Sequence, residues 1–268
     1  MSSKNEINNP KKNSINSFSK DLRIAAFAPF IKRNSLLNKH LNLFKNYTNF
    51  FAANINTNYE KQIYFYTIGI IQFKSCLYNE AITSFSEAIY ERPEYASALI
   101  MRALCYLKTK KLDSAYDDAA LAALYEPKLP LASYIHAYIS YKRKDNDIAL
   151  ESIEKAIKLK NNDAYYYLLK GKILNKLNKP EKAEEALKTS MALNNNQYFV
   201  FEYGKHLINQ NQIQNGIKIL TEINDYPHAV YLIAKTLFPI DKHESKKYFQ
   251  RLLTSSIYRE ISLLYLSR

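Results

Sequence analysis

Residues 69–93 read GIIQFKSCLYNEAITSFSEAIYERP. In this stretch the small residues Gly69 and Ala81 and the later Pro93 follow one another at equal intervals. Apolar residues between these points recur every three or four positions, which indicates two short amphipathic helices. Proline cannot continue a helix, so Pro93 marks the end of the second one. The stretch therefore predicts a helical hairpin.

The same pattern recurs with a period of about 34 residues, an interval that is typical of a stacked helical repeat. The first small residue recurs at Gly69, Ala103, Ala137 and Gly171, and the second recurs at Ala81, Ala115, Ala149 and Ala183. Two antiparallel helices approach closely only where their side chains are small, so we expect the helices to cross at these points. We expect the hairpin interiors to be filled by Ile68, Phe85, Leu121, Ile153 and Leu187, and the next hairpin to pack at Ala88, Ala122, Ala156 and Ser190.

Later units follow the pattern less strictly. Gly204 and Gly216 keep the spacing between the two small residues after a shift of one position, and Pro227 follows them. A weaker sixth pair is expected at 228–238 and 241–255, where the spacing of Asp241 and Glu244 suits a capping box. The segment IYREISLLYL at 257–266 would then be a terminal capping helix.

These repeated stretches resemble the tetratricopeptide repeat family. The resemblance covers about residues 61–255 and implies an all-α, right-handed superhelical solenoid of five to six antiparallel helix pairs with a concave and a convex face. A capping helix at 256–268 would close it. The family holds other polypeptides, so the resemblance implies a non-catalytic scaffold or adaptor that binds protein partners.

In this family the first helix of each hairpin lines the concave groove. Transferring that geometry predicts sixteen partner-binding residues: Tyr66, Ile70, Phe73, Lys74, Ile100, Leu104, Leu107, Lys108, Tyr134, Tyr138, Tyr141, Lys142, Tyr165, Leu168, Lys172 and Lys176. An apolar patch of this size exceeds what a monomer usually exposes, so we expect an apolar or extended peptide to cover it. The lysines at 74, 108, 142 and 176 would form a row along one edge.

One branch of the family grips the acidic tail of heat-shock chaperones with a clamp of Lys and Asn. The equivalent places in this chain hold Tyr66, Ile70, Met101, Leu131 and Ile135, none of which can bind a carboxylate in that way. The sequence therefore argues against a chaperone tail as the partner.

The first 45 residues carry nine basic and two acidic residues, a net +7 out of +13 for the whole chain. We expect a disordered basic tail at 1–20, and an apolar segment (IAAFAPFI, 24–31) with an amphipathic helix at 21–60, whose apolar face carries Leu37, Leu41, Phe44, Tyr47 and Phe51. Two hypotheses describe this arm: it caps the first hairpin, or it folds back into the groove. The basic leader leaves import into an organelle open for a protein that is otherwise expected to be cytoplasmic or elsewhere inside the cell.

Nothing in the sequence indicates catalysis, a cofactor or a metal site. The four glycines are too far apart for a phosphate-binding loop, and the five histidines form no HExxH motif. Cys76 and Cys105 lack metal-ligand spacing and are expected to be reduced and packed on helices. The acidic pairs 117–118 and 184–185 are expected on the solvated outer surface. No apolar run approaches the length needed to span a bilayer.

Two alternative functions remain. A basic, tyrosine-rich helical repeat could stack the bases of single-stranded RNA. The chain could also be a structural subunit of a larger assembly. The period of the repeat favours protein binding over RNA binding, as does the charge excess, which we place in the arm rather than in the groove.

Overall fold

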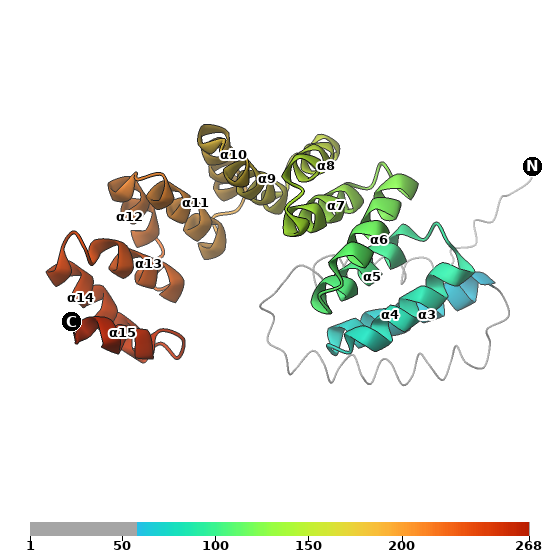
Figure 1. Cartoon of the computed structure of the whole chain (residues 1–268), viewed down its shortest axis with the longest axis horizontal. Helices are drawn as coiled ribbons and strands as arrows, with labels where there is room; N and C mark the ends of the chain where they lie inside the picture. The colour runs from blue at the N-terminus through green and yellow to red at the C-terminus, as the bar shows by residue number, and fades with distance from the viewer. Residues whose placement is uncertain (1–57, 268) are drawn as a thin grey trace, which may run out of the picture.

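A computed structural model describes residues 58–267, which form a tandem array of helical hairpins (Figure 1). The predicted tail at 1–20 and almost all of the segment at 21–60 lie outside the described residues. The hairpins are α3 (Asn58–Lys74) with α4 (Tyr78–Glu91), α5 (Ala96–Lys108) with α6 (Leu112–Tyr125), α7 (Pro130–Arg143) with α8 (Asn146–Leu159), α9 (Ala164–Lys176) with α10 (Pro180–Leu193), α11 (Gln197–Asn209) with α12 (Ile213–Thr221), and α13 (Pro227–Leu237) with α14 (Lys242–Arg251). A 3₁₀ turn (Leu252–Thr254) and α15 (Arg259–Leu266) follow.

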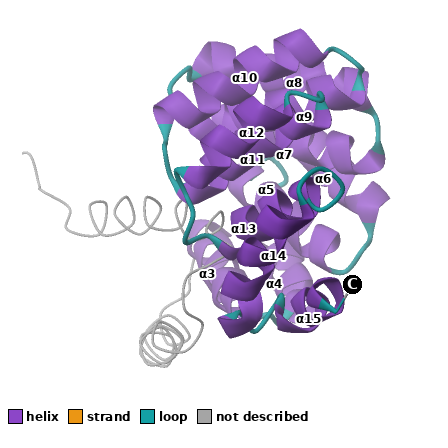
Figure 2. Ribbon diagram, turned by 90° about the vertical axis from the view of Figure 1, so that its left-hand side faces the viewer, coloured by secondary structure: helices purple, strands orange, loops and turns teal. Residues whose placement is uncertain are grey.

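The hairpins follow one another along an arc, and from α5 to α14 the odd-numbered helix of each pair lies on its inner side (Figure 1). Odd-numbered helices of successive hairpins contact each other directly, as between α5 and α7 and between α11 and α13. Figure 2 shows only helices and connecting loops in the described part of the chain. The predicted all-α solenoid of antiparallel helix pairs is confirmed. None of the helices between residues 58 and 267 combines the length and the apolar composition needed to cross a membrane.

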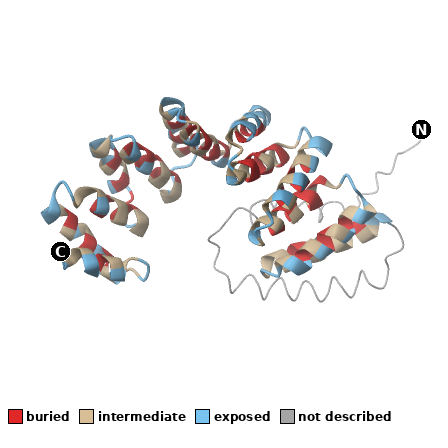
Figure 3. Cartoon of the chain, in the orientation of Figure 1, coloured by how far each residue is buried: buried red, intermediate tan, exposed pale blue. Residues whose placement is uncertain are grey.

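The hairpin interiors are held together by complementary side-chain sizes, and buried residues lie on the facing sides of the paired helices (Figure 3). A Cβ atom added to Gly69 would lie 2.6 Å from the ring of Phe85, which occupies that space from the second helix. Gly171 faces Leu187 in the same way, and Gly204 faces Leu220. Where the second helix carries the small Ala119, the first helix carries alanine at 103. Position 137 is also alanine, although the equivalent residue of its second helix, Ile153, is as large as leucine.

This pairing corrects one predicted interior residue. Leu121 is 38% exposed, because the inward position of α6 belongs to Ala119, which is fully buried. Ile68 is only half-buried. The four residues expected at the junction with the next hairpin are all buried as predicted, and the Ser190 hydroxyl donates a hydrogen bond to the Ala164 carbonyl at 2.7 Å.

The turn inside each of the first five hairpins places one residue in the left-handed region of backbone space: Cys76, Lys110, Lys144, Asn178 and Asn211, with φ between 55° and 73°. Cys76 is therefore exposed in a turn, not packed on a helix as predicted. Cys105 is buried as expected, and burial raises the pKa of its thiol to about 12. The two cysteines form no disulfide.

The left-handed turn residues yield a first testable prediction. Lys110 has φ 62°, a conformation that costs a residue with a Cβ atom about 1–2 kcal/mol, whereas glycine adopts it freely. We expect Lys110→Gly to raise the free energy of unfolding by about 0.5–1 kcal/mol, because the extra flexibility of the unfolded chain offsets part of the gain. Urea unfolding followed by circular dichroism measures the change. Asn178→Gly is the matched control and should gain less, since asparagine tolerates this conformation. A loss of stability in Lys110→Gly would contradict the prediction.

The carboxyl-terminal end follows the predicted order of elements. Asp241 caps α14, since its Oδ1 accepts a hydrogen bond from the backbone N–H of Glu244 at 2.9 Å. The ring of Tyr265 on α15 stacks on Phe249 of α14 at 4.4 Å and meets Phe238 edge-on at 4.9 Å. The last helix thus covers the apolar side of the sixth hairpin.

Candidate binding groove

The odd-numbered helices form the concave face on which the sixteen predicted partner-binding residues were placed. Four of these residues are buried and offer almost no surface to a partner: Ile70, Ile100, Tyr134 and Leu168. They pack in the cores between hairpins, because successive inner helices contact each other directly. Sequence spacing identified the inner helices but not how tightly they are stacked.

The other twelve residues reach the surface to different extents. Eight are half-buried: Tyr66, Phe73, Lys74, Leu104, Leu107, Tyr138, Tyr141 and Lys172. The four exposed ones are Lys108, Lys142, Lys176 and Tyr165. The groove therefore presents lysines beside the edges of aromatic and aliphatic side chains, in place of the broad apolar patch that we predicted.

Charge is divided between the two rows of helices. The inner helices α3, α5, α7 and α9 contain nine basic residues and one acidic residue, a net charge of +8. Their outer partners α4, α6, α8 and α10 contain twelve acidic and four basic residues, a net charge of −8. Part of this charge is compensated between the two rows, since Arg102, Arg143 and Lys170 of the inner helices pair with Asp118, Asp113 and Glu154 of the outer helices. The positive charge of the inner helices and the negative charge of the outer helices cancel in the net charge of the chain. The division becomes visible when the charged residues are counted helix by helix.

Aromatic rings continue along the inner side into the later hairpins. Tyr134 stacks on Tyr166 at 4.9 Å, and Tyr165 meets Phe199 of α11 at 5.0 Å. Further on, the aromatic contacts involve Tyr198, Phe201, Tyr226, His228, Tyr231 and Tyr258. Sequence reasoning stopped at the fourth hairpin and missed these residues. Adding one repeat of 34 residues to Tyr165 leads to position 199, and Tyr198 lies one residue before it. Allowing for the shift of one residue in the fifth hairpin would have identified Tyr198.

Lys172 is bound within the chain. Its Nζ lies 2.8 Å from Glu202 Oε1 and 3.1 Å from the hydroxyl of Tyr198, both on α11. Burial acts to lower the pKa of this ammonium group, but the carboxylate of Glu202 outweighs it and the pKa is raised. This predicted partner-binding lysine joins the fourth and fifth hairpins.

Arg102 makes a second polar link between hairpins. Its Nε and Nη2 donate to the two carboxylate oxygens of Asp118 at 2.7 and 2.8 Å, and its Nη1 donates to Ser86 Oγ at 2.9 Å. Burial acts to lower the pKa of Arg102, but the bonded Asp118 raises it above its ordinary value. Asp118 is 4% exposed, so the prediction that both members of its acidic pair are solvated is wrong. Asp117 is exposed, as predicted.

The second acidic pair divides in a similar way. Glu185 is exposed on α10 as predicted, whereas Glu184 is half-buried. Its Oε2 accepts a hydrogen bond from the side-chain amide of Gln212 at 3.2 Å, and its Oε1 accepts one from the Tyr203 hydroxyl at 3.4 Å. Glu184 therefore binds residues of the fifth hairpin.

One histidine contact escaped the sequence reasoning. His136 Nδ1 lies 3.0 Å from Ser152 Oγ, across the third hairpin from α7 to α8. Ser152 is buried, and burial also lowers the pKa of His136, so the pair links two helices inside the hairpin. Between residues 58 and 267 no group of three or more His, Cys, Asp or Glu residues could hold a metal ion.

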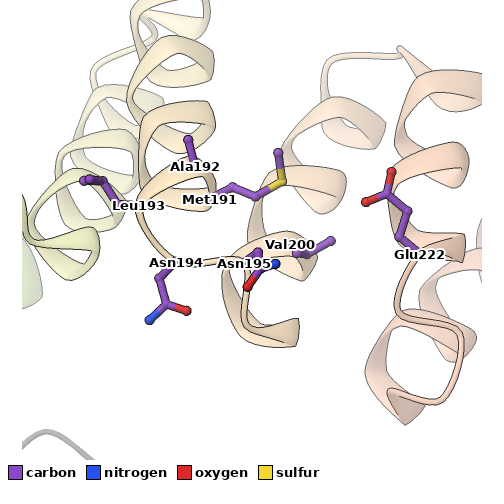
Figure 4. A pocket seen from close by; sticks show the side chains of 7 residues that line it. All are labelled: Met191, Ala192, Leu193, Asn194, Asn195, Val200 and Glu222. Atoms are coloured by element: carbon purple, nitrogen blue, oxygen red, sulfur yellow. The ribbon is translucent and has the colours of Figure 1, made fainter.

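A hollow of about 610 Å³ lies between the end of α10, the start of α11 and the residue after α12 (Figure 4). It is lined by Met191, Ala192, Leu193, Asn194, Asn195, Val200 and Glu222. Glu222 is the one charged side chain in this set, so the lining brings together no acid–base pair and no nucleophile with a base.

Comparisons with known proteins agree with this geometry. Family models described as "Tetratricopeptide repeat" match residues 66–130 and 164–197. No curated protein sequence matches the chain. Among solved structures, PilF of Pseudomonas aeruginosa is similar with a TM-score of 0.64 at 14% identity, over 77% of this chain and 98% of that one.

Two further solved structures share the fold. The Cut9–Hcn1 hetero-tetramer of the APC/C contains a chain that matches with a TM-score of 0.63 at 15% identity, over 77% of this chain and 42% of that one. This protein thus spans less than half of that chain. YrrB, described as a TPR protein with an unusual peptide-binding site, gives a TM-score of 0.52 at 18% identity, over 69% of this chain and 98% of its own.

The paired helices, the small residues at their crossings and the concave inner row define a helical-repeat solenoid. The chain contains tetratricopeptide repeats, at residues 66–130 and 164–197. Proteins with this fold act in protein–protein interaction.

Proposed function

We propose that the concave groove holds an extended segment of another polypeptide, and that this segment carries acidic as well as apolar side chains. The charge division between the helix rows is the observation that carries the proposal. An inner row with a net charge of +8 attracts an anionic ligand, while the outer row of −8 repels it. Apolar edges between the lysines would contribute area burial.

The lysine row supplies a spacing for the ligand. Lys108, Lys142 and Lys176 are exposed at equivalent positions of three successive hairpins. Packed helices lie about 8–10 Å apart. A polyproline II segment repeats every three residues with a rise of about 3.1 Å per residue, so it presents every third side chain on one side at a similar interval. A segment with an acidic residue at every third position would therefore meet successive lysines.

The groove proposal is tested with an array of short overlapping peptides probed with the full-length protein. We expect the retained peptides to be rich in Asp and Glu, and the Lys108→Glu/Lys142→Glu/Lys176→Glu variant to bind them at least about tenfold more weakly, since each exposed ion pair is worth up to about 1 kcal/mol. The matched control is Lys155→Glu/Lys158→Glu/Lys188→Glu, which makes the same charge change at exposed positions of α8 and α10. Equal loss in both variants, or no loss in either, would overturn the proposal.

Single-stranded RNA is a second candidate, favoured by the combination of basic charge and aromatic rings on the inner helices. Salt dependence separates the two ligands. Binding of an oligouridine would weaken steeply and linearly in log–log form as salt rises, because counterions are released from the phosphates. Tighter binding of the oligouridine than of every peptide on the array would favour RNA over the polypeptide.

A further inference from the structure

The outer surface of the first two hairpins carries exposed apolar residues that no contact within the described chain explains. Tyr90 on α4 is 81% exposed and Leu124 on α6 is 69% exposed. Leu121 and Tyr125 on α6 are exposed beside Leu124. We call these four residues the outer patch. The positions equivalent to Tyr90 and Leu124 in the next two hairpins are Lys158 and Ala192, whereas the positions equivalent to Tyr125 are Leu159 and Leu193, which are also exposed. The Tyr90 and Leu124 positions are thus the ones that set the first two hairpins apart.

The two helices that carry the outer patch are acidic, and the nearest exposed basic residues, Arg92 and Lys128, lie in the loops after them. The helices α4 and α6 contain six acidic residues and no basic residue. Four of the six are exposed on the same outer side as the patch: Glu80, Glu87, Asp113 and Asp117. A surface that is both acidic and apolar fits a ligand that is both basic and apolar.

The chain that precedes α3 enters the fold next to this patch. Because α3 and α4 are antiparallel, the Asn58 end of α3 lies beside the Glu91 end of α4, one residue from Tyr90. Tyr59 at this end is 62% exposed and is close enough to Tyr95, after α4, to affect its ionisation. Asn58, to which the preceding residues are attached, therefore lies at the edge of the outer patch.

We propose that residues 21–57 bind the outer patch. This segment contains five basic residues and one acidic residue, and its apolar residues include Phe27, Phe30, Leu41, Phe44 and Phe51. Its charge complements the outer row and is repelled by the inner row, so the outer patch replaces the groove as the site of the arm. Covalent attachment at Asn58 gives the segment a high effective concentration at the patch. The site does not depend on which ligand the groove holds.

Site-specific photo-crosslinking in the full-length chain locates the segment. With a benzoylphenylalanine in place of Tyr90 or Leu124, we expect mass spectrometry to find crosslinks to residues 21–57. The same probe in place of Tyr165, which is exposed on an inner helix, serves as the groove control. Crosslinks of the segment to position 165 in preference to 90 and 124, or no crosslink to it at all, would overturn the proposal. A mixture of isotopically heavy and light chains tests for a second copy as the occupant, and predominantly mixed crosslinks would overturn binding within one chain.

A second measurement uses the trypsin sites at Lys32, Arg33, Lys39 and Lys45. Tyr90→Ser/Leu124→Ser changes two exposed residues and leaves the hairpin cores intact. We expect cleavage at these sites to accelerate at least about tenfold in this variant, because the apolar contacts are lost and no charge is added. Lys158→Ser, at the equivalent position of α8, should leave the rate unchanged. An unchanged rate in the double variant would contradict binding at the outer patch.

Discussion

Replacing Asp118 with alanine is expected to lower the free energy of unfolding by about 3–5 kcal/mol. The carboxylate of Asp118 is buried and accepts two hydrogen bonds from Arg102. In the Asp118→Ala variant, the largely buried guanidinium of Arg102 keeps only its hydrogen bond to Ser86 Oγ. Because the Arg102 side chain remains 19% exposed and reaches some water, we expect a value near the lower end of the range.

The measurement is urea unfolding followed by circular dichroism, with the midpoint compared at unchanged slope. Asp117→Ala is the matched control, since it removes the exposed neighbouring carboxylate and should change stability by no more than about 0.5 kcal/mol. Arg102→Met/Asp118→Leu should recover most of the loss, because apolar residues of similar volume replace both charges. A cost below about 1 kcal/mol for Asp118→Ala would show that the ion pair does not stabilise the second hairpin.

The fold could be predicted from the sequence because steric constraints repeat in it. Small residues such as Gly69 and Ala81 mark helix crossings, and they recur in register through four hairpins. Leu121 was assigned to the interior because it is large and apolar. Steps of 34 residues from Phe85 lead to 119, 153 and 187, so the repeat spacing, followed strictly, identifies Ala119 as the interior residue of α6.

The candidate groove was only partly predictable. The inner helices and the lysine row follow from the family resemblance, but the burial of Ile100 and Tyr134 depends on how closely successive inner helices stack, which is a tertiary property. The burial of Asp118 likewise depends on Arg102, which lies on the other helix of the same hairpin. The opposite charges of the two rows were present in the sequence, although the net charge of the chain concealed them.

Size complementarity inside the hairpin predicts strong coupling between Gly69 and Phe85. A Cβ atom at position 69 would lie 2.6–2.8 Å from three atoms of the Phe85 ring, which are its three nearest neighbours. Gly69→Ala alone should cost about 1–3 kcal/mol through overpacking, less the better helix propensity of alanine. Phe85 is fully buried, so Phe85→Ala alone should cost about 3–5 kcal/mol through lost burial and a cavity.

The double variant Gly69→Ala/Phe85→Ala should be more stable than the sum of the two single effects implies, with a coupling energy of about 1–3 kcal/mol. The new Cβ atom then enters space that the ring has vacated, and the pair becomes the one that the second hairpin already uses, Ala103 with Ala119. Urea unfolding of the four proteins in the cycle measures the coupling. Pairing Gly69→Ala with Leu220→Ala in the fifth hairpin provides the control and should give additive effects, because the two sites share no contact. Additive effects at 69 and 85 would mean that the hairpin relaxes around the added methyl group. Steric fit would then not explain why glycine also stands opposite a leucine at positions 171 and 204.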